Sequence, residues 1–141
     1  MVCSKYSFEE ETIDWSTARE RCSHRENGSL VSMETEKEWH FIKNLTIKRE
    51  KARWFIGLKT VNGSHTWSWL NESIAWVNGT SAGTWRWNNG EPNNFETEKC
   101  GEMLQYGKYN NIKCQGTNYD GDPGYICEKQ VSKFMIMPKL C

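Results

Sequence analysis

Apolar residues recur at every third or fourth position in two stretches of the chain, which is the spacing of amphipathic helices. These residues are Trp15, Ala18 and Cys22 within residues 12–22, and Trp39, Ile42 and Leu45 within residues 34–45. Thr12 or Asp14 can cap the first helix, because a short polar side chain accepts hydrogen bonds from the unpaired N–H groups of the first turn. The pattern therefore predicts two helices.

Six further stretches alternate apolar and polar residues or form short continuous apolar runs, as β-strands do. They are residues 3–8, 29–33, 54–58, 100–105, 109–114 and 124–129. We expect the first to be an edge strand and 54–58, which is apolar throughout, to lie at the centre of a sheet.

Residues 59–99 differ in composition: they are rich in Gly, Asn, Ser, Thr and Trp, and they predict only brief strands such as 67–69. A loop of this length is uncommon in a compact domain and is usually functional. The order of elements predicts one α+β domain over residues 1–129 and a C-terminal tail over 130–141. The apolar run 134–138 in the tail is too short to span a bilayer, so we expect it to pack against the domain and not to insert into a membrane.

The 18 basic and 18 acidic residues balance, and without a basic excess we expect no nucleic-acid partner.

The cysteines and the glycosylation sequons indicate the secretory pathway. Six cysteines without a Cys-x-x-Cys pair favour disulfides over zinc. No signal peptide follows Met1, so we expect an excised extracellular domain, from a secreted protein or from the ectodomain of a membrane protein. Five Asn-x-Ser/Thr sequons are candidate glycosylation sites, at Asn27, Asn44, Asn62, Asn71 and Asn78.

The segment 88-NNGEPNNFETEKC-100 gathers two carboxylates and an amide around a proline and closes on a cysteine. Asn-Gly and Pro-Asn pairs are ordinary in surface turns, so a plain polar turn is one interpretation. The other is a cation site, because calcium is bound by six to eight oxygens from carboxylates, amides and backbone carbonyls. Glu91, Asn93 and Glu98 would supply such oxygens.

Taken together, these segments resemble a C-type lectin-like domain over about residues 3–128. The resemblance rests on Trp15, Ala18 and Cys22 of the first helix, on the runs Ser-Leu-Val-Ser and Trp-Phe-Ile-Gly-Leu, on 87-WNNGEPNN-94, on Cys100 with Cys114, and on 124-GYICEK-129. It implies two helices flanking small antiparallel sheets and a long ligand-binding loop. It also implies two disulfides, Cys22–Cys127 and Cys100–Cys114. Because the ends of this fold lie close together, we expect Cys3 to pair with Cys141; both could instead pair elsewhere or stay free.

The resemblance implies a calcium site made by Glu91, Asn93, Glu98, Asn110 and Asn111, with a cis Glu91–Pro92 bond. The family has Trp-Asn-Asp where this chain has Tyr109-Asn110-Asn111, so the site loses one carboxylate and we expect weaker calcium binding. The acidic turn 119–124 is expected to be a plain Asp-Gly turn before the last strand, although Asp120 or Asp122 could supply the missing carboxylate. A second calcium site of some members is expected to be absent, because Lys59, Asn94 and Lys99 stand at its acidic positions.

A Glu-Pro-Asn loop in this family implies sugars with equatorial vicinal hydroxyls: mannose, N-acetylglucosamine, fucose or glucose. Glu91, Asn93, Glu98 and Asn110 would exchange hydrogen bonds with two hydroxyls of a glycan or glycoprotein ligand. Trp85 or Phe95 could stack on a sugar, but packing beneath the loop is the expected role of both.

The alternative function has the same fold but a protein ligand in place of a sugar. The chain would then be a calcium-independent domain of a cell-surface receptor or of a mosaic extracellular protein. The Trp-rich segment 65–87 would then be the contact surface, since tryptophan is favoured in interface hot spots. An enzyme is not expected. No His-Glu-x-x-His motif occurs, and although Glu91 and Glu98 resemble a glycosidase pair, the neighbouring amides suit a cation better.

Overall fold

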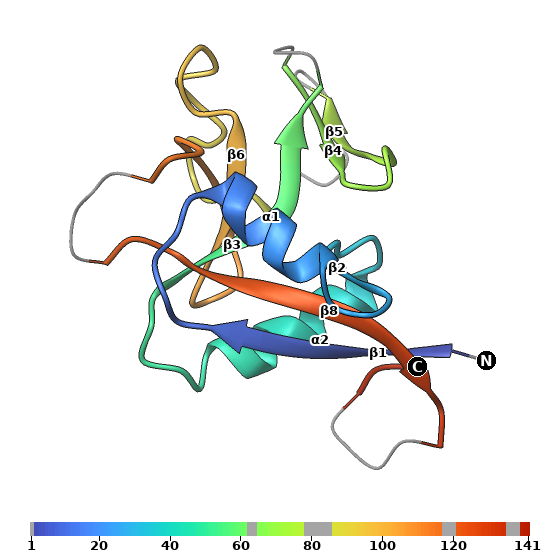
Figure 1. Cartoon of the computed structure of the whole chain (residues 1–141). Helices are drawn as coiled ribbons and strands as arrows, with labels where there is room; N and C mark the ends of the chain where they lie inside the picture. The colour runs from blue at the N-terminus through green and yellow to red at the C-terminus, as the bar shows by residue number, and fades with distance from the viewer. Residues whose placement is uncertain (1, 62–64, 78–85, 117–120, 135–138) are drawn as a thin grey trace.

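The computed structural model describes residues 2–61, 65–77, 86–116, 121–134 and 139–141. Two helices and eight strands occupy these residues. Figure 1 shows them coloured by their position along the chain. The helices are α1 (Trp15–Ser23) and α2 (Glu36–Thr46). The strands are β1 (Val2–Glu9), β2 (Gly28–Leu30), β3 (Arg53–Thr60), β4 (Thr66–Trp69), β5 (Ile74–Val77), β6 (Cys100–Leu104), β7 (Tyr109–Ile112) and β8 (Gly124–Ser132). The predicted α+β class is confirmed.

Both helices begin at a capping side chain. Asp14 accepts a hydrogen bond from the backbone N–H of Thr17 at 2.7 Å, and Thr35 accepts one from Glu38 at 3.1 Å. Each cap satisfies an N–H that the helix leaves unpaired. The first helix therefore starts at Trp15, and Asp14, one of the two predicted caps, is the one used.

The sheet follows the order β1-β8-β3-β4-β5, with β2 beside β8 and with β6 between β3 and β7. The strand β1 pairs antiparallel with β8 along its whole length, from Val2↔Ser132 to Glu9↔Tyr125. Parallel pairing of β3 with β8 at Trp54↔Gly124 joins this ladder to the other strands. As predicted, β1 lies at an edge and β3 at the centre.

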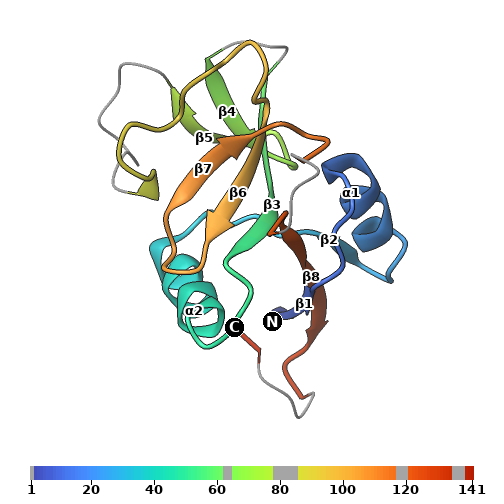
Figure 2. The same ribbon diagram turned by 90° about the vertical axis from the view of Figure 1, so that its left-hand side faces the viewer.

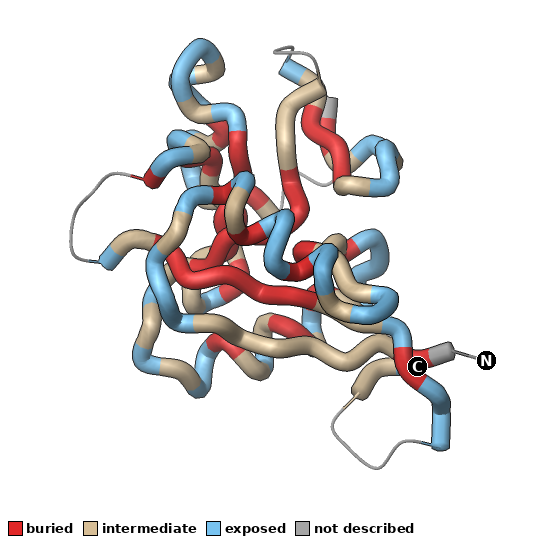
Figure 3. Tube along the Cα trace, viewed as in Figure 1, coloured by how far each residue is buried: buried red, intermediate tan, exposed pale blue. Residues whose placement is uncertain are grey.

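The two helices lie on opposite sides of the β1–β8 ladder (Figure 2). On the α1 side, Trp15, Ala18 and Cys22 pack with Phe55 and Tyr125. The other cluster, which includes Trp39 and Ile42 of α2, extends to the tryptophans of β3, β4 and β5. Buried residues run along β8 into the centre of the molecule (Figure 3).

Three disulfides staple the fold, and all three predicted pairings are confirmed. Cys22–Cys127 joins α1 to β8, and Cys100–Cys114 joins the start of β6 to the segment after β7. Cys3–Cys141 joins the two ends of the chain, which lie together in Figure 1. Leu140 also exchanges two backbone hydrogen bonds with Ser4.

The structure differs from the sequence prediction in three places. The brief strand predicted at 67–69 is confirmed as part of β4, but its hairpin partner β5, in which Trp76 pairs with Trp67, was not predicted. Part of the predicted tail belongs to β8, which continues to Ser132. Phe134 is 81% exposed and does not pack against the domain; residues 135–138 lie outside the described residues.

Of the five sequon asparagines, Asn27, Asn44 and Asn71 are exposed, as a glycosylation site requires. Asn62 and Asn78 lie outside the described residues. No helix in the part of the chain that the structure describes is long and apolar enough to cross a membrane.

Candidate functional site

The loop between Trp87 and β6 is held at both of its ends. Trp87 forms an isolated bridge with Tyr109 of β7, and the N–H of Asn88 donates to the carbonyl of Tyr109 at 2.8 Å. At the other end Cys100 begins β6 and is bonded to Cys114. The loop residues 88–99 therefore lie beside β7, which carries Asn110 and Asn111. The Glu91–Pro92 bond is cis, as the resemblance implied.

Glu91 carries a carboxylate oxygen without a partner. Its Oε1 accepts from Asn93 Nδ2 at 2.9 Å, whereas its Oε2 is buried and receives no hydrogen bond from any described residue. Burial raises the pKa of Glu91, and the negative charges of Glu98 and Glu102 raise it further. A buried carboxylate oxygen without a donor is costly, and a cation or a hydroxyl donor would relieve that cost.

Asn111 is 1% exposed, and its amide binds the loop backbone. Its Oδ1 accepts from the N–H of Asn93 at 3.0 Å, and its Nδ2 donates to the carbonyls of Asn93 and of Glu98, the latter at 3.0 Å. An aspartate here could accept from Asn93 but could not donate to either carbonyl. The asparagine therefore holds the loop through its amide nitrogen, in a way that the expected aspartate would not.

The other two predicted ligands are Glu98 of the loop and Asn110 of β7. Glu98 is half-buried and accepts a long hydrogen bond from Asn94 Nδ2 at 3.4 Å. Asn110 is half-buried and donates from Nδ2 to Oε2 of Glu102 at 3.1 Å. All five predicted residues thus come from the 88–99 loop and the adjacent strand β7. Glu102 was missed, because a glutamate inside an apolar strand gave no sequence signal of a site.

The types of donor present are those of a calcium site. Two carboxylates and three amides supply oxygens of the kind calcium prefers, and Oε2 of Glu91 accepts no hydrogen bond from the described residues. No group of three or more His, Cys, Asp or Glu side chains placed to hold a metal occurs in the described ranges. A site here would therefore need amide oxygens. Asp122 lies beside Gly116, and Asp120 falls outside the described residues.

Comparison with known proteins identifies the fold and the family. The profile of the Lectin C-type domain matches residues 11–129. The chain belongs to the C-type lectin domain family. Mouse C-type lectin domain family 4 member G is 33% identical over 92% of this chain, and the mouse low affinity immunoglobulin epsilon Fc receptor is 32% identical over 78%. The chain spans 40% and 30% of the lengths of these two proteins.

Two solved carbohydrate-recognition domains superpose on this C-type lectin domain. The cow CD23 domain, determined in the presence of a GlcNAc2Man3 oligosaccharide, has a TM-score of 0.69 and 27% identity, covering 92% of this chain and 89% of that one. The mouse scavenger receptor C-type lectin domain has a TM-score of 0.73 and 25% identity, covering 94% and 92%.

Phe95, one candidate for stacking on a sugar, already has an aromatic partner in the C-type lectin domain. Its ring stacks on that of His65, with centroids 4.0 Å apart. Trp85, the other candidate for stacking on a sugar, lies outside the described residues. The tryptophans of 65–87 that the structure describes are buried, which removes the predicted tryptophan contact surface at those positions; they are Trp67, Trp69, Trp76 and Trp87.

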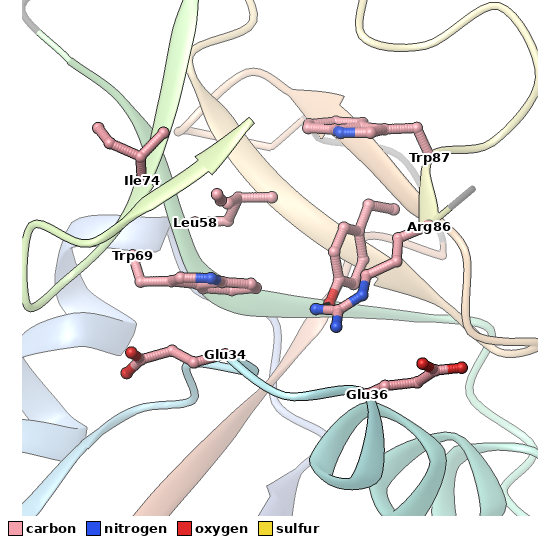
Figure 4. A pocket seen from close by; sticks show the side chains of 9 residues that line it. Glu34, Glu36, Leu58, Trp69, Ile74, Arg86 and Trp87 are labelled. Atoms are coloured by element: carbon pink, nitrogen blue, oxygen red, sulfur yellow. Dashed lines mark hydrogen bonds between the residues drawn. The ribbon is translucent and has the colours of Figure 1, made fainter. Parts of the chain in front are cut away.

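A cavity of about 290 Å³ lies behind the loop, and Figure 4 shows its lining. Trp87 and Tyr109 form one wall, with ring centroids 6.0 Å apart and nearly perpendicular planes. Arg86 extends beside them and donates from Nη1 to the carbonyl of Met33 at 2.7 Å. These contacts fix the residues that immediately precede Asn88 and Asn110.

A second set of carboxylates lies at the other end of the domain, between β1, α2 and β8. Glu38 accepts from the Tyr6 hydroxyl at 2.6 Å, and Glu128 accepts from the Ser32 N–H at 2.9 Å. Burial raises the pKa of Glu128 to about 7, with Glu38 and Glu34 adding repulsion. Burial also raises the pKa of Glu38. The sequence analysis did not single out these residues, because they are far apart along the chain.

Proposed function

We propose that this C-type lectin domain is an extracellular carbohydrate-recognition module that binds sugars through a weakened calcium site at the 88–99 loop. The observation that carries the proposal is the buried Oε2 of Glu91, which has no hydrogen-bond donor among the described residues and lies in a loop with Asn93 and Glu98. A site arranged to accept a cation or a hydroxyl leaves an oxygen in this state.

The ligand class is mannose, N-acetylglucosamine, fucose or glucose, whose vicinal equatorial hydroxyls can be engaged as a pair. Glu91, Asn93, Glu98, Asn110 and Asn111 would hold the ion, which supplies coordination for the two hydroxyls when bound. The protein side chains orient the sugar: Glu91 and Glu98 accept hydrogen bonds from the hydroxyls, and Asn93 and Asn110 donate to them. A single sugar binds weakly at such an open site, so several copies would be needed for avidity.

The weakness of the site follows from Asn111. It contributes no charge, and its Oδ1 already accepts from the N–H of Asn93. A cation would therefore compete with a loop hydrogen bond and meet two carboxylates instead of three. Fewer ligand charges move calcium affinity toward the millimolar range, about 10⁻⁴–10⁻³ M, that extracellular modules use.

The proposal also covers the location of the module, its lack of catalysis and its partners. The module is extracellular, which agrees with three disulfides in a chain whose six cysteines are all paired. It binds and does not catalyse. Its partners are glycans or glycoproteins, with no nucleic acid and no insertion into the bilayer by this segment. The similarity to the cow CD23 domain, which was crystallised in the presence of an oligosaccharide of mannose and N-acetylglucosamine, supports the ligand class.

The test is calcium titration by calorimetry, followed by binding to immobilised mannose and N-acetylglucosamine with galactose as the mismatched sugar. We expect low-millimolar calcium binding that Asn111→Asp tightens, and sugar binding that a chelator abolishes. Asn89→Asp adds the same charge at an exposed position of the same loop and is the control. Calcium binding by Asn111→Asp alone, with no sugar bound by the native chain, would overturn the proposal and favour a calcium-independent protein ligand.

A further inference from the structure

Glu102 is the only charged side chain among the described residues that is completely buried. It lies on β6 directly opposite Asn110 of β7, and on the other side β6 pairs with β3, where Phe55 is its opposite residue and Arg53 lies two positions earlier. Burying an ionised carboxylate costs several kcal/mol unless charge and hydrogen bonds compensate for it. The residues around Glu102 must therefore account for its presence.

Arg53 supplies the counter-charge. Its Nε donates to Oε1 and its Nη2 to Oε2 of Glu102, both at 2.6 Å, which is the bidentate geometry of an arginine–carboxylate pair. The hydrogen bonds to Glu102 are the main cause of the raised pKa of Arg53. Arg53 thus holds both oxygens of Glu102 in a fixed orientation.

The third donor to Glu102 is Asn110. An asparagine amide has nearly the same shape when it is turned by 180°, so its orientation depends on its hydrogen-bond partners. A carboxylate only accepts hydrogen bonds, and for this reason Asn110 must turn its Nδ2 toward Glu102. This orientation leaves Oδ1 of Asn110 for an incoming cation or sugar hydroxyl.

We propose that Glu102, held by Arg53, is a positioning residue that sets the amide orientation of Asn110 and so directs its Oδ1 to the ion, while the second proton of Nδ2 stays available to a sugar hydroxyl. Glu102 does not touch the ligand itself, because it is buried and its oxygens are already bound by three N–H groups. The role in binding rests on the proposed function; the orientation of the amide does not.

The decisive variant is the double change Arg53→Met, Glu102→Leu. Oε2 of Glu102 accepts from both Arg53 Nη2 and Asn110 Nδ2, so a glutamine oxygen at the same place could keep both hydrogen bonds. The double change removes the buried charge pair together and leaves Nδ2 of Asn110 without its acceptor, so the amide orientation is no longer fixed. We expect calcium affinity to fall by about 10- to 100-fold, the usual loss when the partner of a metal ligand is removed. The double change Glu9→Leu, Arg25→Met removes another ion pair, is the matched control and should leave calcium affinity unchanged.

A second substitution separates positioning from general damage. In the Arg53→Met, Glu102→Leu background, Asn110→Asp presents an oxygen to the cation in either orientation of its side chain. We expect calcium affinity to return to within roughly a few-fold of the native value. A double variant that keeps the native calcium affinity, or whose lost affinity Asn110→Asp does not restore, would overturn the proposal.

A ligand-free measurement keeps this inference separate from the proposed function. In the native chain we expect one Nδ2 proton of Asn110 to resonate downfield in the side-chain amide region of an NMR spectrum, because it is hydrogen-bonded to a carboxylate, and to move upfield in the Arg53→Met, Glu102→Leu variant. Asn110 amide resonances like those of exposed Asn44 would overturn the inference, and the native spectrum alone decides this if the double variant does not fold. A native chain with the downfield proton but without calcium binding would refute the proposed function and leave the orientation standing.

Discussion

The carboxylates at the two ends of the domain share a raised pKa and differ in their partners. Glu38 and Glu128, at the end that carries the termini, accept hydrogen bonds from Tyr6 and from the Ser32 N–H. Glu91, in the loop at the other end, has a buried Oε2 that accepts no hydrogen bond from any described residue. Burial raises the pKa in both places. A missing donor, more than a shifted pKa, therefore distinguishes a candidate site from a packed polar cluster.

The two ends are also held together differently. Near the termini, β1 and β8 form a continuous antiparallel ladder between two helices. At the loop end, the chain from Asn88 to Lys99 is fixed by side-chain amides and by the Cys100–Cys114 bond. Damage to the first end should reduce global stability, and damage to the second should mainly change calcium binding.

Removal of a disulfide should give the largest effect. We expect the double variant Cys22→Ala, Cys127→Ala to lower the free energy of unfolding by about 4–5 kcal/mol, because this bond restricts a long loop in the unfolded chain. Its sequence separation is 105, against 14 for Cys100–Cys114. Loss of the shorter bond should cost about 3 kcal/mol and should weaken calcium binding more. Denaturant unfolding and calorimetry on both variants check this. Equal losses of calcium affinity would show that the two ends of the domain do not differ in their effect on calcium binding.

The pH dependence of stability should be the next largest effect. The pKa of Glu128 is about 7 in the folded chain against an ordinary value of 4.5, so the folded chain binds the proton more tightly. Stability from this group is therefore full below about pH 4.5 and falls as the pH rises to about 7, by about 2–3 kcal/mol. Glu11 and Asp14, whose pKa values are lowered, titrate below this window. Glu38 and Glu91, whose pKa values are also raised, add to the slope in the same direction. Unfolding in chelated buffer measures the slope, and Glu128→Gln should reduce it; an unchanged slope in that variant would refute the assignment.

A loop substitution should have a smaller effect. We expect Asn111→Ala to lower the free energy of unfolding by about 2 kcal/mol, since it leaves the Asn93 N–H and two loop carbonyls without their partner. Calcium binding should be lost with it. Thermal midpoints with and without chelator test both, with Asn89→Ala as the control at an exposed position. A midpoint equal to the native one would mean that the loop does not depend on Asn111.

The smallest expected change in stability is that of Glu91→Gln. The variant removes a carboxylate whose Oε2 has no donor, so the thermal midpoint in chelator should stay the same or rise slightly. Calcium and sugar binding should nevertheless disappear, which calorimetry can check. A large fall in the midpoint without calcium would show that Glu91 is structural, and the contrast between the two ends would then fail.

Sequence patterns were sufficient for most of the fold and for part of the site. The helices followed from apolar spacing, and the disulfides followed from the resemblance to the family and the nearness of the two ends of its fold. The same resemblance proposed Glu91, Asn93 and Glu98 as ligands, which stays a prediction. The strand β5 was missed because four apolar residues are too few to establish a period. Glu102 was missed for another reason: its partners, Arg53 and Asn110, lie 49 and 8 positions away and meet it only when β3, β6 and β7 pair.

The Cys3–Cys141 bond has a mechanical consequence. It links residues 138 positions apart whose Cα atoms lie 4.2 Å from each other, so almost the whole chain lies inside one covalent ring. A pulling force applied to the chain on either side of this bond would pass through the two sulfur atoms and leave the β1–β8 ladder unloaded. In an optical trap the oxidised domain should therefore hardly lengthen under tension, and a reducing agent should release the full contour of the ring.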